Sequence, residues 1–222
     1  LNTRIYMSER LNSFFGSTNT VLVHQIKELA EIIINWETAN KYEILDADNY
    51  KIGFAAERTN GFFHRVIRNI LRSHRPMTID VMDNSGASVL QGKRPFFFMF
   101  SDLHVHDLNE KQIGSIQTRF GIISRKYDLL DETGNIFARI SSPRWRLWTF
   151  KIFNHLGDQK GVITKKWGGI LKEAFTDADK FAIDLSQHSW TNYQKSVFLF
   201  ATLCIDLDFF EDNSGSAIEV FD

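Results

Sequence analysis

The chain has 222 residues, a formal net charge of −1 and 43% hydrophobic residues, which is typical of an ordinary globular protein and excludes a disordered chain. Its length fits one large all-β domain or two small ones. Its single cysteine excludes an internal disulfide framework. The first residues lack the apolar stretch of a secretory signal peptide, so we expect a cytoplasmic protein.

Four segments have the pattern of β-hairpins, in which short apolar and polar alternations flank a turn. Each turn opens with Asp or Asn, which can bond the backbone of its own turn, and three of the four contain a Gly that supplies a positive φ. Residues 20–36 are ambiguous, because residues 21–26 suit a strand and residues 27–36 suit a helix. Hairpins at regular spacing predict a barrel or a sandwich. The predicted hairpins cover residues 41–54, 77–90, 122–140 and 148–163.

One segment between these hairpins has helical periodicity instead. The stretch Phe62 to Arg72 repeats apolar residues at every fourth position, and His64, Arg65, Arg68 and Arg72 fall on the opposite face. Such a helix either lies at a membrane interface or packs its apolar side on the protein core.

The apolar run Val197 to Phe210 is the second segment without the hairpin pattern. A bilayer span needs about 20 mostly apolar residues, whereas this run has 14 and contains Asp206 and Asp208. An aspartate at mid-bilayer depth costs about 2.5–3.5 kcal/mol. We therefore predict a buried core helix with a β-rich domain around it. Its expected buried residues are Val197, Phe200, Leu203, Cys204 and Leu207.

Charge is segregated along the chain although the net charge is small. Residues 58–79 hold five arginines and no acid, residues 139–172 hold eight Lys or Arg and one acid, and the last 19 residues hold acids and no base. Basic blocks on a neutral protein suggest a polyanionic partner, either phospholipid or nucleic acid. A solvated face without a function is the alternative of equal weight. Because no recognised nucleic-acid motif accompanies them, nucleic acid is not the partner we expect.

The stretch Lys165 to Phe181, KKWGGILKEAFTDADKF, resembles the signature of the phospholipid scramblase family. As in that family, an apolar helix follows, and the blocks at residues 23–25, 40–44 and 54–57 match in the same order, so the resemblance covers roughly residues 20 to 211. It implies the fold shared with tubby C-terminal and LURP-one-related proteins, which is a closed antiparallel β-barrel of twelve strands around a buried C-terminal hydrophobic helix. On this basis we expect an N-terminal extension (1–19), the barrel domain (20–212) and an acidic C-terminal tail (213–222).

The resemblance also implies calcium-stimulated, ATP-independent movement of phospholipids between leaflets. Animal members carry a calcium-binding segment where this chain has residues 177–188, and the candidate ligands here are Asp177, Asp179 and Asp184. A tight calcium loop needs a Gly at its sixth position and an acid at its twelfth, but those positions are Ala182 and His188. We therefore expect either a weak Ca²⁺ site or acids that cap a turn.

Animal members also have cysteine-rich loops that can be palmitoylated, and this chain has aromatic residues with flanking bases in their place. Trp and Phe beside Arg suit the headgroup boundary of a bilayer, and plain core packing is the competing interpretation. It is favoured for Phe96 to Phe100, which we interpret as a strand with alternate residues pointing inward. The predicted lipid-binding residues are Phe62, Phe63, Arg65, Arg68, Arg72, Arg144, Trp145, Arg146, Trp148, Lys165 and Lys166.

Other chemistry has little support in the sequence. His104 and His106 would share one face of a strand near two acids, which is a minor zinc candidate beside the reading as surface histidines. Phosphate-binding loops, nucleophile elbows and metalloprotease motifs do not occur, and a buried Cys204 without a nearby base is a poor nucleophile. We expect no enzyme.

Two functions follow as hypotheses. The first is a scramblase-like peripheral membrane protein that binds anionic phospholipid and mediates its movement between leaflets. The second is a lipid- or protein-binding barrel of the tubby and LURP-one type, which acts as a membrane-linked interaction module and transports nothing.

Overall fold

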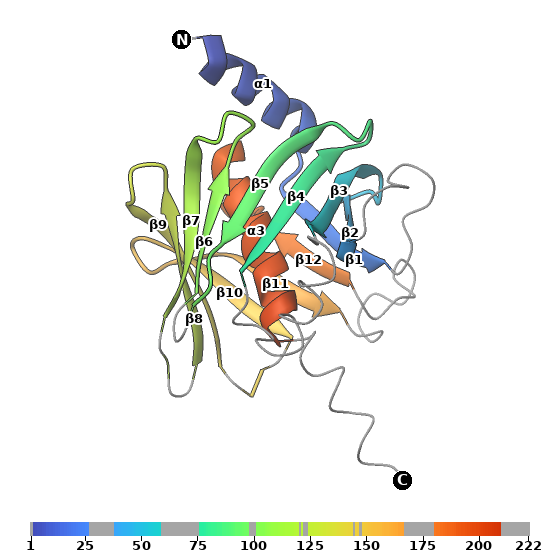
Figure 1. Ribbon diagram of the computed structural model, residues 1–222. Coiled ribbons are helices and arrows are strands. Elements are labelled where there is room, and N and C mark those ends of the chain that lie inside the picture. The colour runs from blue at the N-terminus through green and yellow to red at the C-terminus, as the bar shows by residue number, and fades with distance from the viewer. Residues whose placement is uncertain are drawn as a thin grey trace.

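The computed structural model describes residues 2–26, 38–58, 76–97, 101–119, 121, 124–143, 145–146, 148–166 and 180–209. Within them, twelve antiparallel strands follow one another around a closed barrel, and the first strand pairs with the last (Figure 1). The predicted mainly-β barrel is confirmed. The strands are β1 (Thr20–Ile26), β2 (Thr38–Leu45), β3 (Lys51–Arg58), β4 (Met77–Asp83), β5 (Ser88–Arg94), β6 (Asp102–His106), β7 (Gln112–Arg119), β8 (Ser124–Asp131), β9 (Ile136–Pro143), β10 (Thr149–Asn154), β11 (Gln159–Lys166) and β12 (Lys180–Asp184).

Five hairpin turns share one design, which explains why these strands pair with their neighbours. In the β8–β9 turn, Asp131 Oδ1 accepts the backbone N–H groups of Thr133 (2.9 Å) and Asn135 (3.0 Å), and Gly134 takes φ +84°. The four predicted hairpins are confirmed. A fifth, β6–β7, was not predicted; its positive φ of 59° is adopted by Glu110, whereas Gly or, at Asn49 of the β2–β3 turn, Asn takes this position in the predicted hairpins. The first residues of the five turns are Asp46, Asp83, Asp107, Asp131 and Asn154.

A helix, α3 (Asn192–Phe209), runs through the barrel (Figure 1). It begins five residues before the predicted start at Val197, because a capping box precedes it: Thr191 Oγ1 accepts the N–H of Gln194 (3.2 Å), and Gln194 Oε1 accepts the N–H of Thr191 (2.9 Å). The side chains predicted to be buried are at most 3% exposed: Val197, Phe200, Leu203, Cys204 and Leu207.

Two wall glycines make room for this helix. A Cβ on Gly92 of β5 would lie 2.5 Å from the ring of Phe200, and one on Gly114 of β7 would lie 2.6 Å from Val197. Neither distance is compatible with a real Cβ contact. The helix therefore lies closer to the sheet at these points than any larger residue allows.

A second helix, α1 (Asn2–Phe15), lies at the end of the barrel where the hairpin turns gather (Figure 1). Its buried side chains belong to the same hydrophobic core as the barrel. Asn192 at the start of α3 donates to Asn12 (2.7 Å), and Lys195 Nζ donates to the Thr18 carbonyl (2.6 Å). The N-terminal segment is thus tied to the central helix. The buried side chains of α1 are Met7, Leu11, Phe14 and Phe15.

Neither of the two described helices is long and apolar enough to cross a membrane.

Candidate functional site

The barrel has two unlike ends, because the connections between antiparallel strands alternate between them. One end, here called the hairpin end, carries the five tight turns at residues 46–50, 83–87, 107–111, 131–135 and 154–158. The opposite end, called the loop end, is where the strands border the other six connections, and it is also where α3 terminates (Figure 1). The loop-end connections are residues 27–37, 59–76, 95–101, 120–123, 144–148 and 167–179.

All three aromatic and basic segments singled out in the sequence belong to loop-end connections. The chain leaves β3 and enters β4 at this end, on either side of the segment Phe62 to Arg72. The segments at 96–100 and 145–148 join β5 to β6 and β9 to β10 at the same end. Of the predicted lipid-binding residues, Phe62, Phe63, Arg65, Arg68, Arg72 and Arg144 lie outside the described residues.

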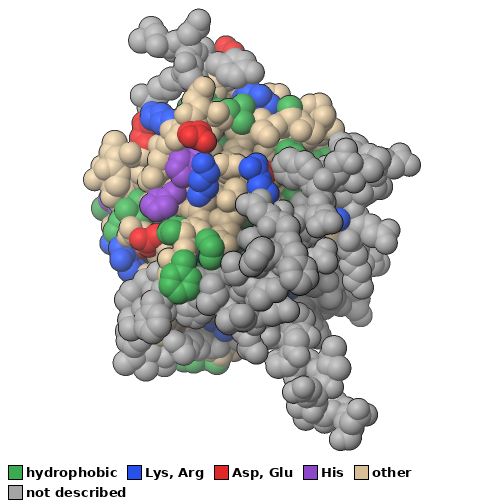
Figure 2. All heavy atoms as spheres, in the orientation of Figure 1, with side chains coloured by type: hydrophobic (Ala, Val, Ile, Leu, Met, Phe, Trp, Pro, Cys, Tyr) green, Lys and Arg blue, Asp and Glu red, His purple; other side chains and the backbone are tan. Residues whose placement is uncertain are grey.

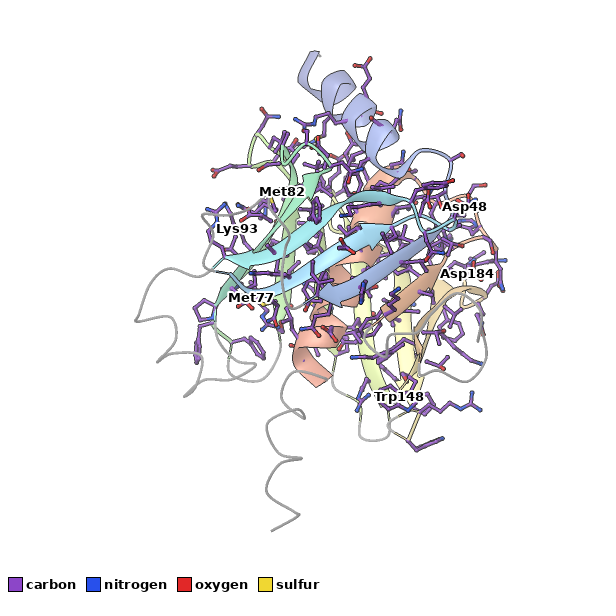
Figure 3. All side chains as sticks on the ribbon, turned by 90° about the vertical axis from the view of Figure 1, so that its right-hand side faces the viewer. Asp48, Met77, Met82, Lys93, Trp148 and Asp184 are labelled. Atoms are coloured by element: carbon purple, nitrogen blue, oxygen red, sulfur yellow. The ribbon has the colours of Figure 1, made fainter. Side chains whose placement is uncertain are left out.

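The β9–β10 loop presents a tryptophan on a pinned backbone. The N–H of Arg146 donates to the Pro143 carbonyl (2.9 Å), and the buried Ser142 hydroxyl donates to the Arg146 carbonyl (2.8 Å). Between these anchors Trp145 is 71% exposed, and Arg146 is exposed beside it. Trp148 is half-buried and lies on the lower side of the molecule in Figure 3, where its carbonyl accepts the N–H of Lys165 (2.9 Å). An apolar ring and a cation are therefore held outward together.

The β5–β6 connection departs from the strand that was expected over Phe96 to Phe100. The strand β5 ends at Arg94, since the following Pro95 has no N–H for the ladder. Phe96 is 53% exposed, and Phe97 lies under the guanidinium of Arg94 at 5.1 Å. The strand interpretation is wrong for these two phenylalanines, and the remaining three residues lie outside the described part of the chain.

Lys165, one of the predicted lipid-binding residues, faces the interior of the barrel. Its side chain is 6% exposed, its Nζ lies 3.2 Å from Asp206 Oδ1, and the hydroxyl of Tyr42 donates to the other oxygen of that carboxylate (2.9 Å). The ammonium group is therefore not displayed to a lipid surface. The cause is strand parity, because Lys165 points the same way as the buried Ile163. For Lys166 the structure gives only a place at the end of β11.

A second buried ion pair holds the last turns of α3 at this end. Arg94 Nη1 lies 2.7 Å from Asp208 Oδ1, with the Arg94 side chain 1% exposed. Burial lowers the pKa of Arg94, but the nearby acidic groups, Asp208 first among them, together outweigh it and raise the pKa overall, so the guanidinium stays charged. Burial also raises the pKa of the Cys204 thiol to about 12, and Asp208 adds to this effect. Cys204 is consequently a protonated core residue and no nucleophile.

The two ends also differ in charge on their described surfaces. At the hairpin end, acids occupy the turns, and the bases there are engaged with acids, as in the pairs Lys51–Glu43 (2.8 Å) and Lys160–Asp158 (3.7 Å). Exposed bases gather toward the loop end. The hairpin-end acids are Asp46, Asp48, Asp83, Asp107, Glu110, Asp131, Glu132, Asp158 and Asp184. The exposed bases on the loop-end half are Arg58, Arg119, Lys126, Arg146 and Lys151, of which Arg58 pairs with Asp80 and Arg119 with Asp128.

Among the residues considered for metal binding, the structure describes Asp184, His104 and His106. Asp184 closes β12 with an Asx turn, in which Oδ1 accepts the N–H (3.0 Å) and the hydroxyl (2.7 Å) of Ser186. Asp177 and Asp179 lie outside the described residues. His104 and His106 share the outer face of β6, with ring centroids 6.4 Å apart, and Figure 2 shows histidine side chains on the surface of the barrel. No group of three or more His, Cys, Asp or Glu side chains suited to a metal occurs among the described residues.

Comparison with known proteins identifies the family of this barrel. The family model described as Scramblase matches residues 4–212. The chain belongs to the scramblase family. The family prediction from the sequence is therefore confirmed.

Individual scramblase relatives match over most of this chain. It is 31% identical to phospholipid scramblase 2 of Bos taurus, over 91% of this chain and 72% of that protein. It is 26% identical to altered inheritance rate of mitochondria protein 25 of Saccharomyces cerevisiae, over 88% of this chain and 71% of that one. The match to a phospholipid scramblase family protein of Schizosaccharomyces pombe covers only 48% of that protein. An X-ray structure of an Arabidopsis thaliana protein aligns at a TM-score of 0.45 and 10% identity, over 86% of this chain and 91% of the other.

Proposed function

We propose that this scramblase-family protein is a peripheral membrane protein that binds anionic phospholipid with the loop end of its barrel. The observation that carries the proposal is Trp145, which is 71% exposed on a loop pinned by two hydrogen bonds. Tryptophan is enriched at the boundary between headgroups and acyl chains, and a neighbouring arginine reaches the lipid phosphates. Arg146 supplies that arginine, and the 53% exposed Phe96 adds a second aromatic group at the same end.

The difference in charge between the two ends supports the same orientation. An anionic leaflet attracts bases near its surface and repels acids. The hairpin end, with its acidic turns, then points away from the membrane, and the loop end faces it. We place the protein at the cytoplasmic leaflet on the same electrostatic ground, since that leaflet carries the anionic lipids.

Family membership supports a second part of the proposal, which is movement of phospholipid between leaflets with stimulation by Ca²⁺. One observation favours a binding module without transport instead: α3 fills the barrel, and Phe198, Leu199 and Phe200 are 0% exposed. Lipids that change leaflet would therefore have to pass outside the barrel. Protein partners remain open under either function.

Co-sedimentation with vesicles tests the binding. The variant Trp145→Ser loses the apolar anchor, and we expect about tenfold weaker binding to phosphatidylserine vesicles, or about 1.5 kcal/mol. Tyr50→Ser is a matched control, because Tyr50 is 72% exposed but lies at the hairpin end. Equal binding by the two variants would contradict the proposed orientation.

Dithionite bleaching of vesicles with a fluorescent lipid in both leaflets tests the movement, with and without Ca²⁺. If the protein binds the vesicles but only their outer-leaflet fluorescence is lost, the result would favour the binding module. Loss of the inner-leaflet signal as well would establish lipid movement. A rate that does not change with Ca²⁺ would remove calcium from the proposal.

A further inference from the structure

We infer that the outer wall of the barrel across β7 to β10 is a docking surface for anionic phospholipid headgroups, so that the protein meets the membrane tilted onto this side. We call this surface the basic rim and define it by Arg119, Lys126, Arg139 and Lys151. The inference rests on the proposed function and assigns residues that are not among the lipid-binding residues predicted from the sequence.

The strand register aligns the rim. Arg119 of β7 lies opposite Lys126 of β8, Lys126 lies opposite Ser141 of β9, and Ser141 lies opposite Lys151 of β10. With neighbouring strands about 4.8 Å apart, this row spans about 14 Å across the wall. Three cations from β7, β8 and β10 thus lie in one row, with Ser141 of β9 between the last two.

These side chains point outward. Arg119, Lys126 and Lys151 are exposed, while the residues next to them in the strands, Tyr127 and Phe150, are at most 1% exposed in the core. Because alternate residues of a strand face opposite sides, the row lies on the outer surface. Strands hold the row in place, so that little conformational freedom is lost when a flat surface binds it.

The local charge is positive even after pairing. Asp128 is the acid within the rim, and it accepts from Nε of both Arg119 (2.8 Å) and Arg139 (3.2 Å). No described acid pairs with Lys126 or Lys151. Four bases therefore share one carboxylate, so these five side chains carry a net formal charge of about +3, four cations less one anion.

The rim is continuous with the exposed tryptophan. Lys151 is the third residue of β10 and Lys126 the third residue of β8, both counted from the loop end. The β9–β10 loop, which carries Trp145, leads into β10 at this same end. A bilayer in contact with Trp145 thus lies close to the row of cations, which combines an apolar anchor with an electrostatic one.

A lipid surface fits this geometry better than a nucleic acid. Proteins that bind single strands combine aromatic groups with a basic groove that follows the backbone. The rim lies on the convex outer wall of the barrel, whereas a pocket lined by residues 13–20, 46–48 and 52 lies at the hairpin end. Charge complementarity with a broad anionic surface therefore decides the assignment.

Neutralising the rim tests the inference against a control with the same net charge. The variant Arg119→Gln/Lys126→Gln/Lys151→Gln removes three cations, each of which contributes about fivefold to binding near an anionic membrane. We expect about 100-fold weaker binding to phosphatidylserine vesicles and a flatter salt dependence. The control variant Lys51→Gln/Lys111→Gln/Lys160→Gln removes three hairpin-end cations, and its binding should change less than threefold. Lys126→Gln/Lys151→Gln, which breaks no described ion pair, replaces the triple variant if the triple variant unfolds.

The possible outcomes separate the two proposals. If the wild-type protein does not bind the vesicles, the proposed function and the rim both fail. If it binds and the two triple variants bind equally, the rim is overturned while the proposed function stands. Rim-dependent binding of single-stranded RNA, with vesicle binding unaffected by the substitutions, would also overturn the rim as a lipid surface.

A dye at Ser141 gives a readout that does not depend on affinity. Cys204 is buried and its thiol pKa is about 12, so Ser141→Cys can be labelled selectively. We expect an environment-sensitive fluorophore at this position, within the row of cations, to shift to the blue when phosphatidylserine vesicles are added. The same dye on Ser88→Cys, which lies at the hairpin-end start of β5, should not shift. A shift at Ser88 without one at Ser141 would contradict the inference.

Discussion

The hairpin end and the loop end of this barrel put their polar groups to different uses. At the hairpin end each turn is closed by the side chain that begins it, as Asp83 does with the N–H groups of Ser85 (2.9 Å) and Ala87 (3.1 Å). At the loop end the described connections expose Trp145 and Phe96. One end therefore satisfies its own backbone and specifies the fold, while the other presents side chains that the fold does not need.

The same contrast holds for ion pairs. Hairpin-end pairs such as Lys51–Glu43 lie on the surface, with side chains 41% and 25% exposed. The loop-end pair Lys165–Asp206 lies inside the barrel, at 6% and 4%. A buried charge is strongly destabilising once its partner is removed, whereas a surface pair contributes about 0–1 kcal/mol. The end proposed to meet the membrane is thus also the end where the central helix is held by charge.

Breaking the buried pair should have the largest effect. In Lys165→Met the carboxylate of Asp206 keeps the hydroxyl of Tyr42 but loses its cation. We expect the free energy of unfolding to fall by about 3–5 kcal/mol, measured by urea denaturation. Lys51→Met at the hairpin end is the control and should cost about 0–1 kcal/mol. Similar losses in the two variants would show that the ends do not differ in this way.

Adding a methyl group at Gly92, where α3 packs against β5, should have the next largest effect. A methyl group on Gly92 meets the ring of Phe200 at 2.5 Å and Leu103 at 3.2 Å, so either α3 or the wall must move. We expect Gly92→Ala to lower the free energy of unfolding by about 1–3 kcal/mol, as overpacking of a core does. Near-UV circular dichroism should change as well, because aromatic rings pack around α3. An unchanged denaturation midpoint would mean that the helix is not held tightly against β5.

The hairpin end was largely predictable from sequence, because its signals are local. An Asp or Asn followed within three residues by Gly defines three of the turns, and the capping box at Thr191 and Gln194 is a local signal for the start of α3. The β6–β7 turn is harder to predict, because Glu110 takes a positive φ that is usual for glycine and, as at Asn49 of the β2–β3 turn, for asparagine.

The loop end was harder to predict, because its features depend on contacts between distant residues. The inward direction of Lys165 follows from the register of β11 with β12 and from a partner 41 residues away in the sequence. The basic rim exists only after four strands align, and none of its residues is unusual in its own segment. The charge distribution along the sequence indicates a polyanionic partner, whereas the surface that would bind it can be identified only from the strand register.

The smallest expected effect is a pH dependence at the hairpin end. Burial tends to raise the pKa of Asp131, but the hydroxyl of Thr133 and the backbone N–H groups of Asn135, Thr133 and Gly134 outweigh it and lower the pKa below the ordinary value of 3.8. The unfolded chain therefore binds this proton first as the pH falls, so the stabilisation is complete above that value and is lost as the pH drops through the folded-state pKa. Asp131→Asn keeps an Oδ1 acceptor, as Asn154 does in the β10–β11 turn. We expect the variant to be slightly less stable than the wild type at pH 7 in urea denaturation, because its amide lacks the charge, and to lose less stability as the pH falls below 3.8. Parallel stability curves down to the acid transition would mean that the turn is held by hydrogen-bond geometry alone, with no contribution from the carboxylate charge.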